Sequence, residues 1–189
     1  MSKKRQLLID TALDLFYKNG INSIGINEIL KVSGVAKRTL YTHFDSKESL
    51  VLAALTQRHQ IFCTWLADQI ADSNDDQELI EDLFNALERW FNSAEVALGD
   101  FRGCFFINTA AEFSDVNSEI ARYCAQHKQT VREIIQRQMT TNNPLLLDAI
   151  CLLKEGAITT AYMTGQGKQA SEKSIQILNA LRQESSRSC

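Results

Sequence analysis

The stretch from residue 20 to residue 50 constrains the fold most, because it holds two short helical patterns joined by a tight turn. The first pattern places apolar residues at helical spacing, at Ile26, Ile29 and Leu30. Gly34 supplies the backbone freedom that the turn needs. In the second pattern Leu40 and Phe44 lie four residues apart and share one face, which leaves the polar side chains of residues 37–43 on the other faces. The stretch therefore predicts a helix-turn-helix, a motif that contacts DNA.

The start of the second helix breaks two local rules of helix stability. Ala36 has no side-chain oxygen to cap the first amide groups. Lys37 and Arg38 place cations at the positive end of the helix dipole. Because such violations concentrate at functional sites, we expect these amides and cations to face phosphates and base edges.

The whole segment resembles the DNA-binding motif of the TetR family of transcriptional regulators. The matching residues are Gly20, Ile26-x-x-Ile29, Gly34-Val35, Thr39-Leu40-Tyr41-x-His43-Phe44 and Ser46-Lys47-Glu48-x-Leu50. The resemblance implies that bases are read by Lys37, Arg38 and Thr42. It implies phosphate contacts by Thr39, Tyr41, His43 and Lys47. Gly25 and Ala36 open the two helices at positions where many relatives have Ser or Thr, and we include both in the expected interface.

The rest of the chain predicts further helices and no sheet. A single proline, few alternating β-branched stretches and 44% apolar residues favour an all-α fold of about nine helices. We expect them at residues 3–19, 26–32, 37–44, 46–71, 77–94, 103–113, 116–140, 144–164 and 171–183, with an Asp45–Glu48 capping box before the fourth. This order resembles the whole TetR architecture. The resemblance implies a DNA-binding domain over residues 1–48 and an effector-binding and dimerisation domain over residues 49–189.

Charge and cysteine content fit that division. Residues 1–50 carry a net charge of +3 and residues 51–189 carry −6, so the basic end is the expected DNA end. Five cysteines without a CxxC pair indicate reduced thiols, and no apolar run reaches the roughly 18 residues of a membrane span. Asp10 and Asp14 interrupt the apolar run near the N-terminus, which argues against a signal peptide. We expect a cytoplasmic protein without membrane contact.

Two apparent chemical sites are discounted. Cys124-x-x-His127 offers two metal ligands one turn apart, but no second pair completes the set, so we expect no metal and no cofactor. Glu112, Asp115 and Glu119 surround a helix junction and are interpreted as caps and solvated charges. Without a convergent nucleophile or metal set, the chain is not expected to be an enzyme.

Aromatic and aliphatic side chains gather between the fourth and sixth helices. Each could simply belong to the core, but the family resemblance implies that some line a cavity for a small apolar or amphipathic effector. The candidates are Phe62, Trp65, Leu66, Phe84, Leu87, Trp90, Phe91, Phe105 and Phe106.

The last two helices are the expected dimer interface. The eighth is apolar around much of its circumference, so it is either wholly buried or paired with another chain. By resemblance, two helices from each subunit would form a four-helix interface in a homodimer. The candidate residues are Leu146, Ile150, Leu153, Ala157, Ile158, Ala161, Ile175 and Leu178.

Cys104 is a candidate sensor. It falls in the expected first turn of the sixth helix and close in sequence to Arg102, and both features favour a reactive thiolate. The alternative is inert packing, because cysteine is often buried and Phe105 and Phe106 follow it.

The leading hypothesis is a homodimeric repressor that is released from a palindromic double-stranded DNA operator when an effector or a chemical modification shifts its conformation. The alternative is a ligand sensor or scaffold whose helix-turn-helix no longer binds DNA. The effector, the operator, the regulated genes and the choice between repression and activation are not determined by the sequence.

Overall fold

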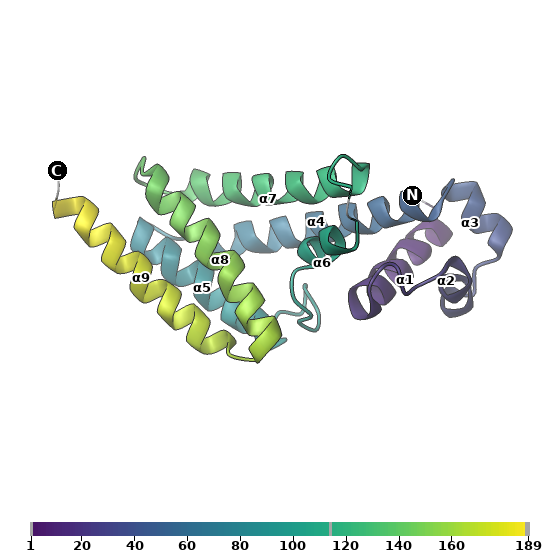
Figure 1. Cartoon of the computed structure of the whole chain (residues 1–189), viewed down its shortest axis with the longest axis horizontal. Coiled ribbons are helices and arrows are strands. Elements are labelled where there is room, and N and C mark those ends of the chain that lie inside the picture. The colour runs from purple at the N-terminus through teal and green to yellow at the C-terminus, as the bar shows by residue number, and fades with distance from the viewer. Residues whose placement is uncertain (1, 114, 188–189) are drawn as a thin grey trace. The chain divides into compact units, whose positions relative to one another are not determined.

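The computed structural model of the chain describes residues 2–113 and 115–187. Over these residues the chain forms nine α-helices and no strand, which confirms the all-α prediction (Figure 1). The helices are α1 (Lys3–Asn19), α2 (Ile26–Ser33), α3 (Lys37–His43), α4 (Lys47–Ile70), α5 (Asp76–Phe91), α6 (Phe105–Glu112), α7 (Glu119–Gln138), α8 (Pro144–Thr164) and α9 (Gly167–Arg187). None of the described helices is long and apolar enough to span a membrane.

The chain divides into two compact units. Unit 1 comprises Met1–Gln60 and Cys104–Lys128, and unit 2 comprises Ile61–Gly103 and Gln129–Cys189. Unit 1 thus contains the helix-turn-helix, the first part of α4, all of α6 and the first part of α7. It extends beyond the boundary that we expect at residue 48.

In unit 1, α1 packs against both helices of the helix-turn-helix. Its buried stripe is Leu8, Ile9, Ala12 and Phe16, at the spacing of one helical face. Gly34 ends α2 with a left-handed φ of +66° and donates its N–H to the carbonyl of Leu30 at 2.9 Å. The turn predicted at this glycine is confirmed.

The start of α4 corrects the predicted capping box. The Ser46 hydroxyl accepts the Ser49 N–H and the Ser49 hydroxyl accepts the Ser46 N–H, each at 3.2 Å. The reciprocal pair is therefore Ser46 and Ser49, one residue later than the predicted Asp45 and Glu48. Because α4 begins at Lys47, the capping position immediately before it is Ser46.

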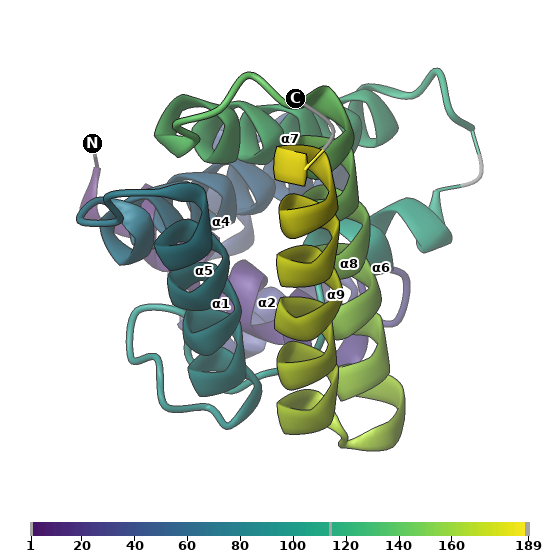
Figure 2. The same ribbon diagram turned by 90° about the vertical axis from the view of Figure 1, so that its left-hand side faces the viewer.

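Unit 2 is built from α5, α8 and α9, together with the remaining parts of α4 and α7. Helices α8 and α9 run side by side (Figure 2). Asn143 caps α8 by accepting the Leu146 N–H at 3.1 Å, and Pro144 occupies its first turn. Helix α9 begins at Gly167, four residues before the predicted start, where a Cβ atom would lie 2.8 Å from the ring of Phe91. The helix can approach α5 this closely because residue 167 has no side chain.

Candidate nucleic-acid interface and effector region

Helix α3 has one packed face and one exposed face. Leu40 and Phe44 are buried, and the guanidinium of Arg5 lies 5.1 Å from the centre of the Phe44 ring. The exposed residues of the predicted interface are Gly25, Ala36, Lys37, Arg38, Tyr41 and Thr42, while Thr39, His43 and Lys47 are half-buried. The buried face therefore holds the helix in place, and the opposite face presents polar side chains to solvent, as a recognition helix requires.

The amino end of α3 is left without a side-chain cap, as its sequence predicts. Ala36 has extended backbone angles, and its carbonyl accepts the N–H groups of Thr39 and Leu40 at 2.9 and 3.2 Å. The first amide groups of a helix have no carbonyl partner within the helix. Here they lie at an exposed end beside two cations, Lys37 and Arg38, which suits an anionic partner such as a phosphate.

Two side chains of the predicted interface already have partners inside the protein. The Lys47 ammonium donates to the carbonyl of Ile21 at 2.6 Å and lies 5.9 Å from the centre of the Phe16 ring. An ammonium has three N–H donors, so a phosphate contact by Lys47 remains possible. The Thr42 hydroxyl donates to the carbonyl of Arg38 at 2.9 Å, which leaves its oxygen to accept from an amino group of a base.

Glu112 ties α6 to the DNA-binding helices within unit 1. Its carboxylate accepts the N–H groups of Ile21 and Asn22 at 2.8 and 2.6 Å, in the turn between α1 and α2. The Asn22 amide returns a bond to the Glu112 carbonyl at 3.3 Å. The interpretation of Glu112 as a cap or solvated charge is therefore wrong, and a partner about 90 residues away leaves no local sequence signal.

The aromatic candidates for an effector site are divided between the two units. In unit 2 the ring of Trp90 lies at the centre of a cluster, with centroid distances of 4.9 Å to Phe101, 5.5 Å to Phe62 and 6.2 Å to Trp65. Leu66, Phe84 and Leu87 are also buried, and Phe91 is half-buried. Phe105 and Phe106 belong instead to unit 1, where Phe105 packs edge-on against Tyr17.

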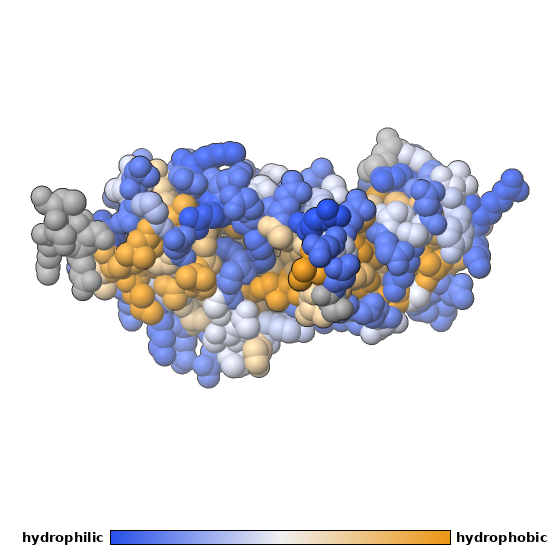
Figure 3. Space-filling view, turned by 45° about the horizontal axis from the view of Figure 1, so that its top comes forward, coloured by the Kyte–Doolittle hydropathy of each residue, from blue (hydrophilic) through white to orange (hydrophobic). Residues whose placement is uncertain are grey.

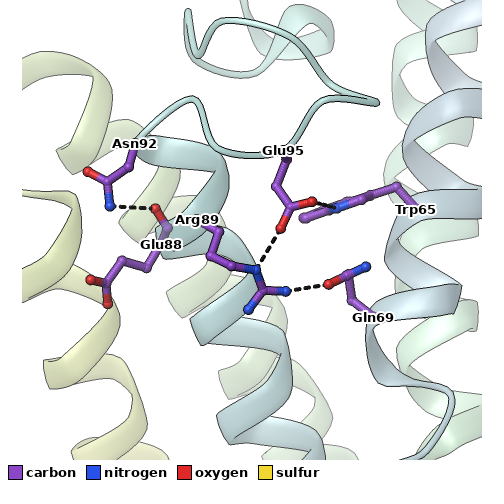
Figure 4. Close-up of polar contacts among 6 residues, drawn as sticks. All are labelled: Trp65, Gln69, Glu88, Arg89, Asn92 and Glu95. Atoms are coloured by element: carbon purple, nitrogen blue, oxygen red, sulfur yellow. Dashed lines mark hydrogen bonds and ion pairs between the residues drawn. The ribbon is translucent and has the colours of Figure 1, made fainter.

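A polar network borders the aromatic cluster of unit 2. The carboxylate of Glu95 accepts the Trp65 indole N–H at 2.9 Å and the Arg89 Nε–H at 2.7 Å (Figure 4). Arg89 also donates to the side chain of Gln69. The cluster therefore combines buried aromatic rings with a charged, hydrogen-bonded border.

The predicted dimer residues on α8 and α9 are mostly turned inward. Six of the eight are buried within the chain and cannot offer their side chains to a second copy: Leu146, Ile150, Ala157, Ile158, Ala161 and Leu178. Leu153 and Ile175 are half-buried. For the six buried residues the prediction is corrected, because their apolar stripe faces the interior of unit 2.

Other apolar residues of the same two helices are exposed. Leu152 is 73% exposed, Met163 76% and Ile177 53%. A shallow groove of about 260 Å³ runs between α8 and α9, lined in part by Leu153, Gly156 and Ile177. Figure 3 shows apolar side chains at the surface in the end of the molecule that holds these helices.

Cys104 lies at the capping position of α6 and not in its first turn. Its side chain is 8% exposed, and the Lys128 ammonium lies 3.2 Å from its sulfur. Arg102, the cation predicted to act on the thiol, ion-pairs with Asp100 at 3.9 Å. Two cations interact with Cys104, Lys128 and the buried Arg58, and sequence proximity could reveal neither of them.

The fold and the exposed face of α3 are those of a helix-turn-helix domain. Residues 8–54 match the model of the bacterial regulatory proteins of the tetR family. The repressor ComR of Escherichia coli is 26% identical over 140 residues, 71% of this chain and 65% of ComR. YuxN, an uncharacterized regulator of Bacillus subtilis, is 44% identical over 55 residues, which are 29% of this chain and 19% of YuxN.

The fold is also similar to that of solved TetR-family structures. A TetR-family transcriptional regulator from Streptomyces coelicolor has a TM-score of 0.81 and 25% identity, with 97% of this chain and 90% of that one covered. Residues 8–54 therefore carry a DNA-binding segment of the TetR type, and the chain has the fold of TetR-family regulators over nearly its whole length. The aligned region covers less than two thirds of the length of ComR and YuxN.

Proposed function

We propose that the protein is a ligand-released repressor that binds a palindromic operator as a homodimer. The observation that carries this proposal is the exposed face of α3, where Lys37, Arg38, Tyr41 and Thr42 stand on a buried base of Leu40 and Phe44. ComR is named as a repressor, which supports the sign of regulation. A DNA-bound regulator would act in the cytoplasm.

A dimer is required because one helix-turn-helix makes too few base contacts for specific binding. The exposed apolar residues on α8 and α9, Leu152, Met163 and Ile177, supply a surface for a second copy. A twofold axis through this surface would place two α3 helices on successive half-sites of the operator.

For the effector we propose a small amphipathic molecule held by the aromatic cluster of unit 2. Its apolar part would meet Phe62, Trp90 and Phe101, and its polar part would exchange bonds with Arg89 and Glu95. Release from DNA would follow if the molecule bound more tightly to a conformation with the wrong spacing between the two α3 helices.

The second candidate is a sensor or scaffold that no longer binds DNA, favoured only by the uncapped starts of α2 and α3 at Gly25 and Ala36. Titrating the purified chain into a fluorescent duplex from upstream of its own gene separates the two. Specific, salt-sensitive binding supports the repressor. Equal affinity for that duplex and a scrambled one would support the second candidate.

A further inference from the structure

Helix α1 begins with three consecutive cations, Lys3, Lys4 and Arg5, and has no acidic residue in its first turn. Within residues 2–19, which the structure describes throughout, the Ser2 hydroxyl makes no capping hydrogen bond. Cations in this position lie at the positive end of the helix dipole and destabilise the helix. The start of α3 shows the same two departures, and there we expect phosphate contacts. The first turn of α1 therefore carries more positive charge than its own helix favours.

The two lysines direct their charge to solvent. The side chains of Lys3 and Lys4 are exposed, and no acidic residue follows either of them by one helical turn. Lys18 differs, because near the other end of the same helix it ion-pairs with Asp14, one turn away, at 2.8 Å. The ammonium groups of Lys3 and Lys4 thus remain accessible to a partner outside the chain.

Contacts within unit 1 place these lysines beside α3. The guanidinium of Arg5 lies 5.1 Å from the centre of the ring of Phe44, the residue at which α3 ends. The amino end of α1 lies near α3 in Figure 1. The Gln6 side chain donates to Gln57 of α4 at 2.6 Å. The first turn of α1 is therefore held against the carboxyl end of α3 and against α4, and all of these residues belong to unit 1.

We propose that Lys3 and Lys4 bind DNA phosphates at the edge of the groove that α3 enters. This step rests on the proposed function and adds the start of α1 to the DNA interface. Phosphates are the expected targets because a lysine carries a point charge on a flexible stem, without the rigid fork of donors that reads base edges. Backbone contacts at the end of a recognition helix fix its register on the duplex.

Phosphate contacts have a measurable signature. Each neutralised phosphate releases counterions and makes the slope of log affinity against log salt more negative by about 0.9. Contacts by both Lys3 and Lys4 therefore contribute roughly two to this slope for each subunit. They stabilise complexes with every duplex alike, because the phosphates carry no sequence information.

The test compares two double variants of the full chain. Lys3→Ala/Lys4→Ala removes the proposed contacts, and Lys18→Ala/Lys168→Ala removes two exposed charges elsewhere on α1 and on α9. Each is titrated by fluorescence anisotropy, over a range of salt concentrations, into the duplex from upstream of the gene and into a scrambled duplex. We expect Lys3→Ala/Lys4→Ala to lose at least about tenfold in affinity for both duplexes at low salt and roughly two in slope per subunit. The control should bind as the wild type does.

Thermal unfolding separates DNA contact from a structural role. Removal of two cations from the positive end of the dipole should leave Tm of Lys3→Ala/Lys4→Ala unchanged or raise it. Weaker binding at an unchanged or higher Tm supports the phosphate contacts. Weaker binding together with a lower Tm would make the two lysines structural residues and overturn the proposal.

The outcomes also separate this proposal from the proposed function. Discrimination by the wild type between the two duplexes tests the proposed function alone. If the wild type discriminates and Lys3→Ala/Lys4→Ala keeps its salt slope, only the phosphate contacts of α1 are overturned. A variant that loses discrimination at an unchanged slope would also overturn them, because the lysines would then read bases. Binding of neither duplex by the wild type would overturn both proposals.

Discussion

Replacing Glu112 tests the link between α6 and the DNA-binding helices. The carboxylate accepts two backbone N–H groups, of Ile21 and Asn22, in the turn that follows α1. Glu112→Gln keeps one amide oxygen as an acceptor and removes the charge, while Glu112→Ala removes both bonds. The turn should remain folded but open more often, because its two amides then lose the carboxylate that they share.

The cost follows from the type of bond. A hydrogen bond to a charged group contributes about 1.5–3 kcal/mol when well buried. Glu112 is half-buried, and its bond to Asn22 is exposed, so solvent screening reduces that figure. We expect Glu112→Ala to lower the free energy of unfolding by about 1–3 kcal/mol and Glu112→Gln by less. For a chain of this size that corresponds to a fall in Tm of roughly 3–9 °C.

Amide hydrogen exchange measures the protection that these two hydrogen bonds give. The amides of Ile21 and Asn22 should exchange faster in Glu112→Ala, with little change in the amides of α8. Glu119→Gln, at an exposed position in the first turn of α7, is the control and should leave the turn protected. Unchanged protection of Ile21 and Asn22 in Glu112→Ala would refute the link.

The remaining predictions concern charge, assembly and the thiol. Lys47→Ala should weaken binding to all duplexes alike. In fluorescence anisotropy titrations, the slope of log affinity against log salt should become less negative by about one per lost phosphate contact. The same change should lower Tm, because Lys47 donates a hydrogen bond to the Ile21 carbonyl. Leu152→Glu should convert the dimer to a monomer in size-exclusion chromatography, whereas an unchanged dimer would move the interface elsewhere. If Cys104 beside Lys128 is a sensor, its alkylation by iodoacetamide should remain fast at pH 6 and release DNA; an unreactive Cys104, or DNA release that persists in Cys104→Ser, would make it a packing residue.

Helix ends with clear chemical signals were predicted well. The bounds of α1 and α8 match the prediction. Gly20 ends α1, and α8 begins at Pro144 and ends before Gly165. The start of α4 lies one residue later than the sequence predicts, at Lys47, because Ser46 and not Asp45 caps it. The sequence predicts the start of α9 four residues too late. The helix begins at Gly167, which packs closely against Phe91, and this tertiary contact leaves no local sequence signal.

The site residues divide in the same way. Helical spacing alone predicts the exposed face of α3. Once Leu40 and Phe44 are buried, the polar residues of this short helix must lie on the other faces. Glu112 and Ile21 are 91 residues apart, and no local sequence pattern predicts their contact. The apolar circumference of α8 predicts either burial within the chain or pairing with another chain. Most of it packs inside unit 2, because hydrophobicity does not distinguish these two kinds of burial.

The claim that α3 reads DNA is tested most directly with Arg38→Ala. Affinity for the duplex from upstream of the gene and for a scrambled duplex should be measured at matched salt, with Lys168→Ala on α9 as a control that removes the same charge. The account predicts that Arg38→Ala loses about 1–3 kcal/mol of discrimination per lost base contact, while Lys168→Ala keeps it. Full discrimination in Arg38→Ala would contradict the assignment of α3 as the recognition helix.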